Sequence, residues 1–123
     1  MATKLAVVTL RAEDVMLAAH FYRDVIGLKL LTHDQHRPHF DLDGVYLVIL
    51  KGRSLPPLDP VPARFPIIAF AIDDLDETIN RLRAHHVDLP WGIEEDADSR
   101  WVMFHDPAGN LIELAYFKGQ RVT

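Results

Sequence analysis

Two stretches of the chain share one pattern of hydrophobic and polar positions. In each stretch a β-rich run ends in an acidic pair, first Glu13-Asp14 and then Asp73-Asp74, and apolar residues then recur at helical spacing. Asp14 is a suitable N-cap for a helix that runs to about Val25, and Gly27 follows where a left-handed residue usually ends a helix. The acidic pairs lie about 60 residues apart, so the pattern predicts an internal repeat.

The pattern after each helix predicts strands. In the first half we expect a strand at 28–32 and a hairpin of 39–42 and 45–50, because Asp43-Gly44 is a strong two-residue turn signal. The first helix is expected to bury a stripe of apolar residues, namely Leu17, Phe21, Val25 and Leu28.

The second half begins with a predicted strand at 66–72 and a helix whose apolar side carries Leu75, Ile79 and Leu82. We then expect a short extended segment at 87–91, an acidic loop at 93–99, and strands at 100–105 and 110–117. A proline-rich connector at 51–65 separates the halves. The chain is therefore predicted to be one α+β domain (1–123), with module one at about 4–50 and module two at about 66–117.

The last two strands meet at a turn with a distinctive sequence, Phe104 to Leu114. Asp-Pro-Ala-Gly at 106–109 is turn chemistry, since proline presets one φ angle and glycine supplies a positive one. Glu113 stands among Leu111, Ile112, Leu114 and Ala115. A charge in such a run is costly without a partner or a wet cavity, so Glu113 lies on a solvated face or points into a cleft.

Composition limits the functional classes. At 123 residues and 49% hydrophobic content the chain can form one core. The net charge is −5 with no basic stripe, which argues against nucleic acid as a partner, and no apolar run is long enough to span a membrane. The N-terminus does not read as a signal peptide. The absence of cysteine fits a reducing compartment, so we expect a cytoplasmic protein.

Three segments carry a resemblance to a known family: LRAED with FYRDVIGLKLL, AFAIDDLDE, and FHDPAGNLIELAYF. They resemble the vicinal oxygen chelate superfamily, which includes glyoxalase I, bleomycin-resistance proteins, fosfomycin-resistance enzymes and extradiol dioxygenases. The resemblance covers about residues 4–117. It implies two βαβββ modules that form an open, cleft-shaped sheet, a small-molecule ligand and a homodimer, with modules exchanged between chains in some members.

The resemblance also implies a divalent metal held by the first and last strands of each module. The corresponding positions here are Val7, Val48, Ile67 and Glu113. Three of the four are aliphatic, whereas a catalytic metal normally needs about three His, Glu or Asp ligands. No metal site is therefore assigned, with Glu113 as the surviving position, and a divalent metal is left open as a cofactor.

Strand alternation extends these positions to a predicted cleft face. If Val7 and Val48 face the cleft, the hairpin register brings His39, Asp41 and Tyr46 to the same face. The predicted ligand-binding residues are Thr9, Arg11, Asp41, Tyr46, Trp101, Met103 and His105. Glu113 and His39 are the candidate catalytic residues, because His39 lies opposite Val48 and titrates near neutral pH.

The remaining histidines receive structural roles. His33 and His36 are expected in a solvated loop, and His20 on the surface of the first helix. His85 and His86 are expected to cap the second helix at its carbonyl end. His105 either lines the rim of the cleft or hydrogen-bonds the turn that follows it. Arg11 either binds a ligand carboxylate or pairs with Glu113 or another acid.

Three functions remain open on the sequence. The first is a metal-free protein that binds a small aromatic or anionic molecule in its cleft. The second is a lyase, isomerase or dioxygenase that uses Glu113 with His39 or Asp41, with or without a divalent metal. The third is an interaction domain whose cleft is empty. We favour the first over the second because the predicted metal positions are aliphatic.

Overall fold

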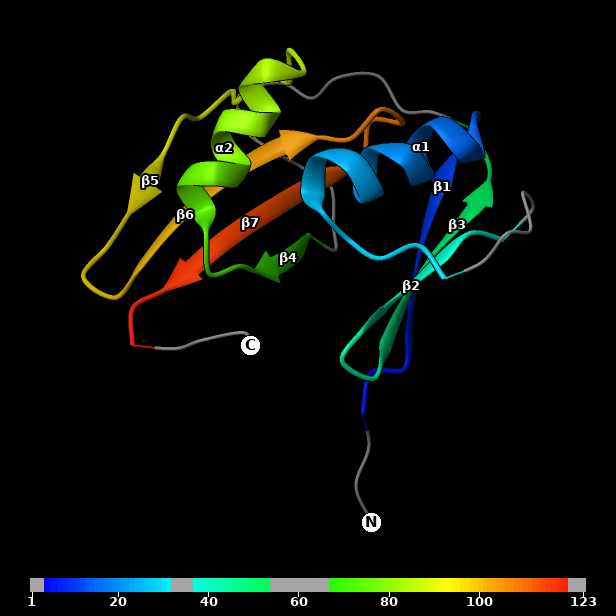
Figure 1. The fold of residues 1–123 in the computed structure, drawn as a ribbon, viewed down its shortest axis with the longest axis horizontal. Helices are drawn as coiled ribbons and strands as arrows, with labels where there is room; N and C mark the ends of the chain where they lie inside the picture. The colour runs from blue at the N-terminus through cyan, green and yellow to red at the C-terminus, as the bar shows by residue number, and fades with distance from the viewer. Residues whose placement is uncertain (1–3, 32–36, 54–66, 120–123) are drawn as a thin grey trace.

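The structure is a computed structural model that describes residues 4–31, 37–53 and 67–119. In these ranges the chain forms two modules, each with a helix over a small mixed sheet (Figure 1). The elements are β1 (Val7–Ala12), α1 (Val15–Phe21), η1 (Tyr22–Ile26), β2 (His39–Leu42), β3 (Val45–Lys51), β4 (Ile68–Ala71), α2 (Leu75–Ala84), β5 (Glu94–Glu95), β6 (Ser99–His105) and β7 (Leu111–Phe117). His33, His36 and most of the proline-rich connector lie outside the described residues.

The sheet of module one has the order β1-β3-β2, with β1 parallel to β3 and β2 antiparallel to it. The hairpin turns at Asp43-Gly44, where both residues have positive φ angles. The predicted register is confirmed, since His39 pairs with Val48 and Asp41 with Tyr46. Phe40, Leu47 and Ile49 consequently fall on the buried face.

The sheet of module two repeats this scheme with the order β4-β7-β6-β5. Its first and last strands, β4 and β7, are again parallel, and β6 is antiparallel to both of its neighbours, β7 and β5. Both modules thus pair their first and last strands in parallel, and the α+β class is confirmed.

The predicted strand at 28–32 is wrong, and the segment predicted to be extended at 87–91 does not pair with the sheet. Residues 28–31 contribute only one bridge, Leu30 with Phe40, and a single flanking hydrogen bond from Leu31 N to His39 O. Residues 87–91 form a loop that closes with Gly92 N donating to Leu89 O. The strand that pairs with the outer edge of β6 is β5, which consists of Glu94 and Glu95. These two residues lie within the segment predicted to be an acidic loop.

The helices start and stop as the capping residues predict. Asp14 accepts from Leu17 N and Asp74 from Glu77 N, each through its side chain. Gly27 ends η1 with a φ of 93°, and its amide donates to Tyr22 O across a π-helical turn. His85 caps α2, as predicted.

The predicted apolar stripe of the first helix is correct only in part. Phe21 and Val25 are buried, but Leu17 is 56% exposed. The buried face is formed instead by Ala18, Ala19, Tyr22 and Ile26. The π-helical turn explains part of this shift, because it changes the residues that face the sheet after Phe21. The stripe of α2 is buried as predicted.

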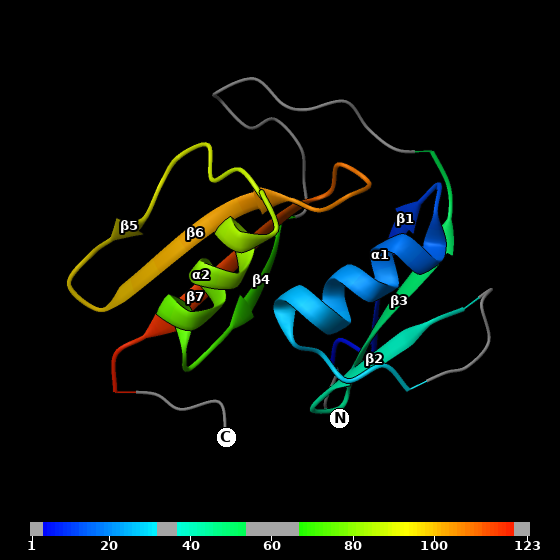
Figure 2. The same ribbon diagram turned by 45° about the horizontal axis from the view of Figure 1, so that its top comes forward.

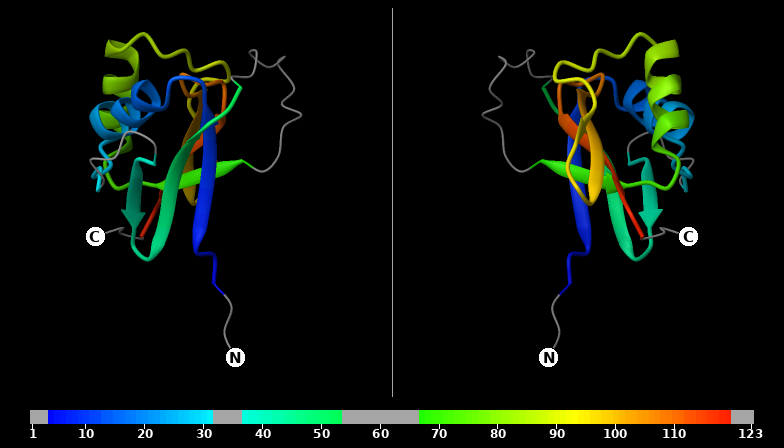
Figure 3. Two further views of the ribbon diagram at one scale, coloured as in Figure 1. Left: turned by 90° about the vertical axis from the view of Figure 1, so that its right-hand side faces the viewer. Right: turned by 90° about the vertical axis from the view of Figure 1, so that its left-hand side faces the viewer.

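Both helices lie on the same side of the two sheets and leave the opposite side uncovered (Figures 2 and 3). The burial of alternate residues in β1 agrees with this arrangement. Leu10 and Ala12 are buried, whereas Val7, Thr9 and Arg11 are exposed. The core therefore fills the space between helices and sheets, and the predicted cleft residues other than His105 lie on the other face. None of the helices in the described part of the chain is long and apolar enough to cross a membrane.

Two polar networks hold the modules together. In the first, Tyr22 of module one donates its hydroxyl to Asp106 of module two at 2.6 Å, with both side chains buried. Asp106 also accepts from Ala108 N, from Asn110 N and from the Asn110 side chain, which in turn reaches Arg11 O. Burial and the neighbouring carboxylate raise the pKa of Tyr22, so its hydroxyl keeps its proton and acts as a donor.

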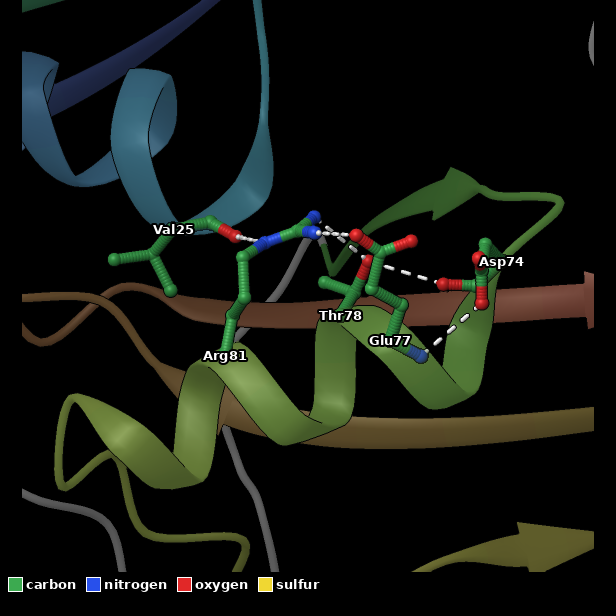
Figure 4. A network of polar contacts seen from close by, with 5 residues as sticks. All are labelled: Val25, Asp74, Glu77, Thr78 and Arg81. Atoms are coloured by element: carbon green, nitrogen blue, oxygen red, sulfur yellow. Dashed lines mark hydrogen bonds and ion pairs between the residues drawn. The ribbon is translucent and has the colours of Figure 1, made fainter.

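The second network centres on Arg81 of α2 (Figure 4). Its Nε donates to Val25 O in η1 at 2.9 Å, which joins the two helices. Its remaining nitrogens donate to Glu77 and Thr78 one turn earlier, and Thr78 donates to Asp74 O. One side chain thus connects the carbonyl end of η1 to the first turns of α2.

Candidate functional site

The uncovered face of module one carries the predicted residues Thr9, Arg11, His39, Asp41 and Tyr46. Their strands place them together, because Thr9 and His39 both pair with Val48, and Asp41 pairs with Tyr46. The rings of His39 and Tyr46 meet edge to face with centroids 5.8 Å apart. The Asp41 carboxylate accepts from Gly44 N at the hairpin turn.

Arg11 lies exposed at the margin of this face. Its Nη1 donates to Lys51 O at 3.0 Å, and Gly52 leaves room for the arginine stem, since a Cβ there would lie 2.8 Å from Arg11 Cβ. Among the described residues Arg11 forms no ion pair, so the alternative in which Glu113 neutralises it does not occur within one chain. Its guanidinium keeps donors for a further acceptor.

The uncovered face of module two carries Glu113, Trp101 and Met103. Glu113 lies between Ala69 of β4 and Met103 of β6, and Trp101 lies between Ala115 and Glu94. The small side chains of Ala69 and Ala71 border the carboxyl group on the β4 side. The result is an aromatic and thioether surface around one acid.

Glu113 is electrostatically unusual. Desolvation by burial, followed by the nearby charge of Glu94, raises the pKa of its carboxyl group above the ordinary value. Glu94 comes from β5, opposite Trp101, and neither carboxylate has a hydrogen-bond or ion-pair partner among the described residues. Sequence reasoning missed Glu94 because it assigned the acidic stretch to a loop, and only the pairing with β6 places it on this face.

Among the described residues the two faces are not hydrogen-bonded into one sheet. They belong to separate hydrogen-bonded sheets. A cavity of about 660 Å³ lies between Asp41 and Tyr46 of module one and the exposed edge of β4, with Ala69 and Ala71 in its wall. Thr9, Arg11, Trp101, Met103 and Glu113 are not in that wall, so this cavity does not bring all the predicted residues together.

His105 has different neighbours from the other predicted residues. It packs against Trp91, with ring centroids 6.3 Å apart, and lines a separate cavity on the helix side of the molecule. Its Nε2 atom is buried and has no hydrogen-bond partner within the described part of the chain. Its part in ligand binding at the cleft stays a prediction.

Comparison with known proteins places the chain in a family. The profile of the Glyoxalase/Bleomycin resistance protein/Dioxygenase superfamily matches residues 4–114. The chain belongs to this superfamily, which confirms the resemblance seen in its motifs.

Its relatives include characterised and uncharacterised proteins. The chain is 26% identical over 110 residues to the metallothiol transferase FosB of Staphylococcus haemolyticus, with 87% of this chain and 78% of FosB covered. It is 26% identical over 113 residues to the uncharacterised protein YaeR of Escherichia coli, with 84% and 88% covered.

Solved structures share the fold. A lactoylglutathione lyase from Agrobacterium tumefaciens superposes with a TM-score of 0.68 at 25% identity, over 94% of this chain and 95% of the other. The fosfomycin resistance protein FosX of Listeria monocytogenes superposes with a TM-score of 0.76 at 22% identity, over 97% of both chains. The glyoxalase fold predicted from the sequence is thereby confirmed.

The donor set does not fit the metal that family enzymes hold. Val7, Val48 and Ile67 stand at three of the four positions that the family resemblance predicts for metal ligands, and an aliphatic side chain has no atom that coordinates a cation. No group of three or more His, Cys, Asp or Glu side chains across residues 4–31, 37–53 and 67–119 could hold a metal ion. Glu113 and Glu94 are carboxylates, but two such groups fall short of the usual ligand count.

Proposed function

We propose that this protein binds a small aromatic or anionic organic molecule on its uncovered sheet faces, without the divalent metal of the family's enzymes. The observation that carries the proposal is the aliphatic character of Val7, Val48 and Ile67. A site that had to hold a metal could not place valine or isoleucine there, whereas a site that holds an organic ring gains apolar contact from them.

The other side chains of these faces support such a ligand. Tyr46 and Trp101 offer flat apolar surface, Met103 an adaptable thioether, and Arg11 a fork of donors that suits a carboxylate. Alternating apolar surface and a few fixed polar groups is the usual composition of a small-molecule site.

We propose that a homodimer completes the cleft. In the described residues β1 and β4 each pair with one neighbour only, so both strands have a free edge. Val7 is 50% exposed and Tyr46 is 42% exposed on the same face. The free edge of β1 in one chain and that of β4 in a second would bring Arg11 and His39 opposite Glu113 and Trp101. The cytoplasm is proposed as its location, supported by the absence of cysteine.

A second candidate is an enzyme of the lyase, isomerase or dioxygenase type. The raised pKa of Glu113 favours it, because a carboxyl group that titrates closer to neutrality is a better general acid and base. His39 or Asp41 would be the second proton-transfer group. FosB is named a metallothiol transferase, and that activity is a property of the relative.

A metal titration tests the first proposal. The parent protein is expected to show the same thermal midpoint with EDTA and with Mn²⁺, Ni²⁺ or Zn²⁺. A variant with Val7→His, Val48→Glu and Ile67→His restores a four-ligand set with Glu113, and its midpoint should rise with metal. This variant shows that the assay detects a metal. Stabilisation of the parent by a divalent cation would overturn the metal-free site.

Arg11 tests the ligand class. For an anionic aromatic molecule identified by a thermal-shift screen, Arg11→Ala should weaken binding by about 10-fold or more, because a charge-assisted hydrogen bond is lost. Arg83→Ala, on the exposed surface of α2, is the matched control and should leave the affinity unchanged. Equal binding by Arg11→Ala and the parent would show that Arg11 does not anchor the ligand.

A further inference from the structure

A second cavity lies on the opposite side of the molecule from the proposed cleft. It has a volume of about 460 Å³ and is formed where α1 and η1, the segment after α2, and the end of β6 meet. Its apolar wall comes from both modules, with Phe21 and Val25 on one side and Val87 and Pro107 on the other. The volume is in the range of pockets that hold small organic molecules.

Imidazole groups dominate the polar part of this cavity. His20, His85, His86 and His105 all line it, although they come from three elements far apart in the sequence. His105 Nε2 is buried and lacks a hydrogen-bond partner among the described residues, which is costly unless a ligand or water supplies one. His20, His85 and His86 are not among the residues predicted to face the cleft.

The protonation of one histidine is set by its neighbour. His85 Nδ1 lies 2.9 Å from Arg81 O, and a carbonyl oxygen can only accept, so Nδ1 carries the proton. In the neutral ring Nε2 is then an acceptor. Asp88 adds a carboxylate that has no partner in the described part of the chain, whereas Asp24 is already paired with Arg23 at 2.7 Å. In the described part of the chain the cavity therefore offers unused acceptors at His85 Nε2 and at the Asp88 carboxylate.

We propose that this cavity is a second small-molecule site, which takes a compact aromatic molecule carrying a hydrogen-bond donor, such as a phenol or an amine. The ring packs against Phe21, Val25 and Val87. The donor meets the acceptors offered by His85 and Asp88, so that the ligand bridges the two modules. The site is separate from the proposed cleft and does not depend on it.

Metal binding is the competing explanation for a group of histidines. The structure argues against it, because no group of three ligating side chains among the described residues is arranged to hold an ion. The carboxylates argue equally against an anionic ligand at neutral pH. Several titratable side chains face the cavity. His20 of α1 and Asp24 of η1 line one side, and Asp24 is paired with Arg23. The others are His85, His86 and Asp88 after α2, and His105 of β6.

Amide chemical shifts locate the site directly. At pH 7.5, millimolar phenol and benzylamine should each shift signals of residues 17–25, 85–88 and 105–107, and benzoate should not. The imidazole nitrogen spectrum should report a change at a cavity histidine. If phenol binds and benzylamine does not, the cavity prefers a neutral hydrogen-bond donor. If only benzylamine binds, the cavity prefers a cationic donor. Either result supports the site.

Variants separate the site from general stability effects. Val87→Trp should fill the cavity and weaken probe binding at least 10-fold. Asp88→Ala, at an exposed position, removes one of the proposed acceptors and should weaken binding by about 2- to 5-fold with the fold retained. Asn80→Ala on α2 is the control and should bind as the parent does. Benzoate binding as tight as phenol, shifts confined to the sheet faces, or Zn²⁺ but not phenol shifting these residues would each overturn the proposal.

Discussion

At the scale of single residues, a buried carboxylate explains why the turn at 106–109 is built as it is. Asp106 is 4% exposed and accepts hydrogen bonds from both sides of the module junction. The positive φ of Gly109 closes the turn so that the backbone donors reach the carboxylate. The turn within this family motif thus clamps the two modules together, whereas Glu113, later in the same motif, lies on the uncovered sheet face.

Removing the hydroxyl of Tyr22 should destabilise this clamp. Tyr22→Phe is expected to lower the free energy of unfolding by about 2 kcal/mol, because Asp106 loses a donor in a buried site. Tyr46→Phe removes an exposed hydroxyl and should cost less than about 0.5 kcal/mol. Urea unfolding of both variants measures the difference. Equal costs for the two variants would show that the Tyr22–Asp106 bond contributes little.

The two acids of module two should titrate as neighbours. Because Glu94 contributes to the raised pKa of Glu113, Glu94→Gln should lower the pKa of Glu113 toward its ordinary value. Glu95 is the next residue on β5 and points to the other face, so Glu95→Gln is the matched control. Carboxyl carbon shifts followed against pH give both values. If Glu94→Gln leaves the pKa of Glu113 unchanged, the charge of Glu94 does not influence the Glu113 carboxyl group.

The raised pKa of Glu113 also gives stability a defined pH dependence. The folded chain binds this proton more tightly than the unfolded chain, so the free energy of unfolding falls as pH rises from the ordinary pKa through the raised one. Glu113→Gln removes this loss and should be the more stable protein at pH 7, by about 0.5 kcal/mol after solvent screening. Below the ordinary pKa the two proteins should differ least, and a variant less stable than the parent at pH 7 would contradict this reasoning.

At the scale of elements, the contact between η1 and α2 depends on Arg81. Val25 lies in the last turn of η1, where the carbonyl oxygens have no partner within the helix, and its oxygen accepts from the Arg81 guanidinium. Sequence periodicity predicted both helices and their caps, because those signals are local. It did not predict this contact, which joins residues 56 positions apart.

Arg81→Ala should therefore lower stability more than its exposed neighbour does. We expect a cost of about 1–2 kcal/mol, since Val25 O and Thr78 both lose a donor. Arg83→Ala, on the exposed side of the same helix, should stay within about 0.5 kcal/mol of the parent. Thermal or denaturant unfolding measures both. If Arg83→Ala lowers the free energy of unfolding more than Arg81→Ala does, the cause is helix propensity or net charge rather than the Arg81 hydrogen bonds.

At the scale of the whole molecule, the free edges of β1 and β4 determine how copies would associate. We expect light scattering to give twice the mass of one chain. Val7→Lys should weaken that dimer by about 10-fold or more, because a charge would be desolvated beside the free edge of β1. Leu31→Lys, a comparably exposed aliphatic position near β2 at the other margin of the sheet, should leave the dimer intact. A monomeric parent protein would rule out the completed cleft.

The sequence by itself determined the repeat, the helix caps, the hairpin register and the family, because these rest on local turn chemistry and on the alternation of side chains along a strand. It placed Thr9, Arg11, His39, Asp41, Tyr46 and Glu113 on strand faces for the same reason. Only the tertiary structure decided that β5 lies at Glu94–Glu95, that Glu94 influences Glu113, and that four histidines share a cavity. Those facts depend on contacts between segments far apart in the chain, and no periodicity in the sequence encodes which distant segments meet.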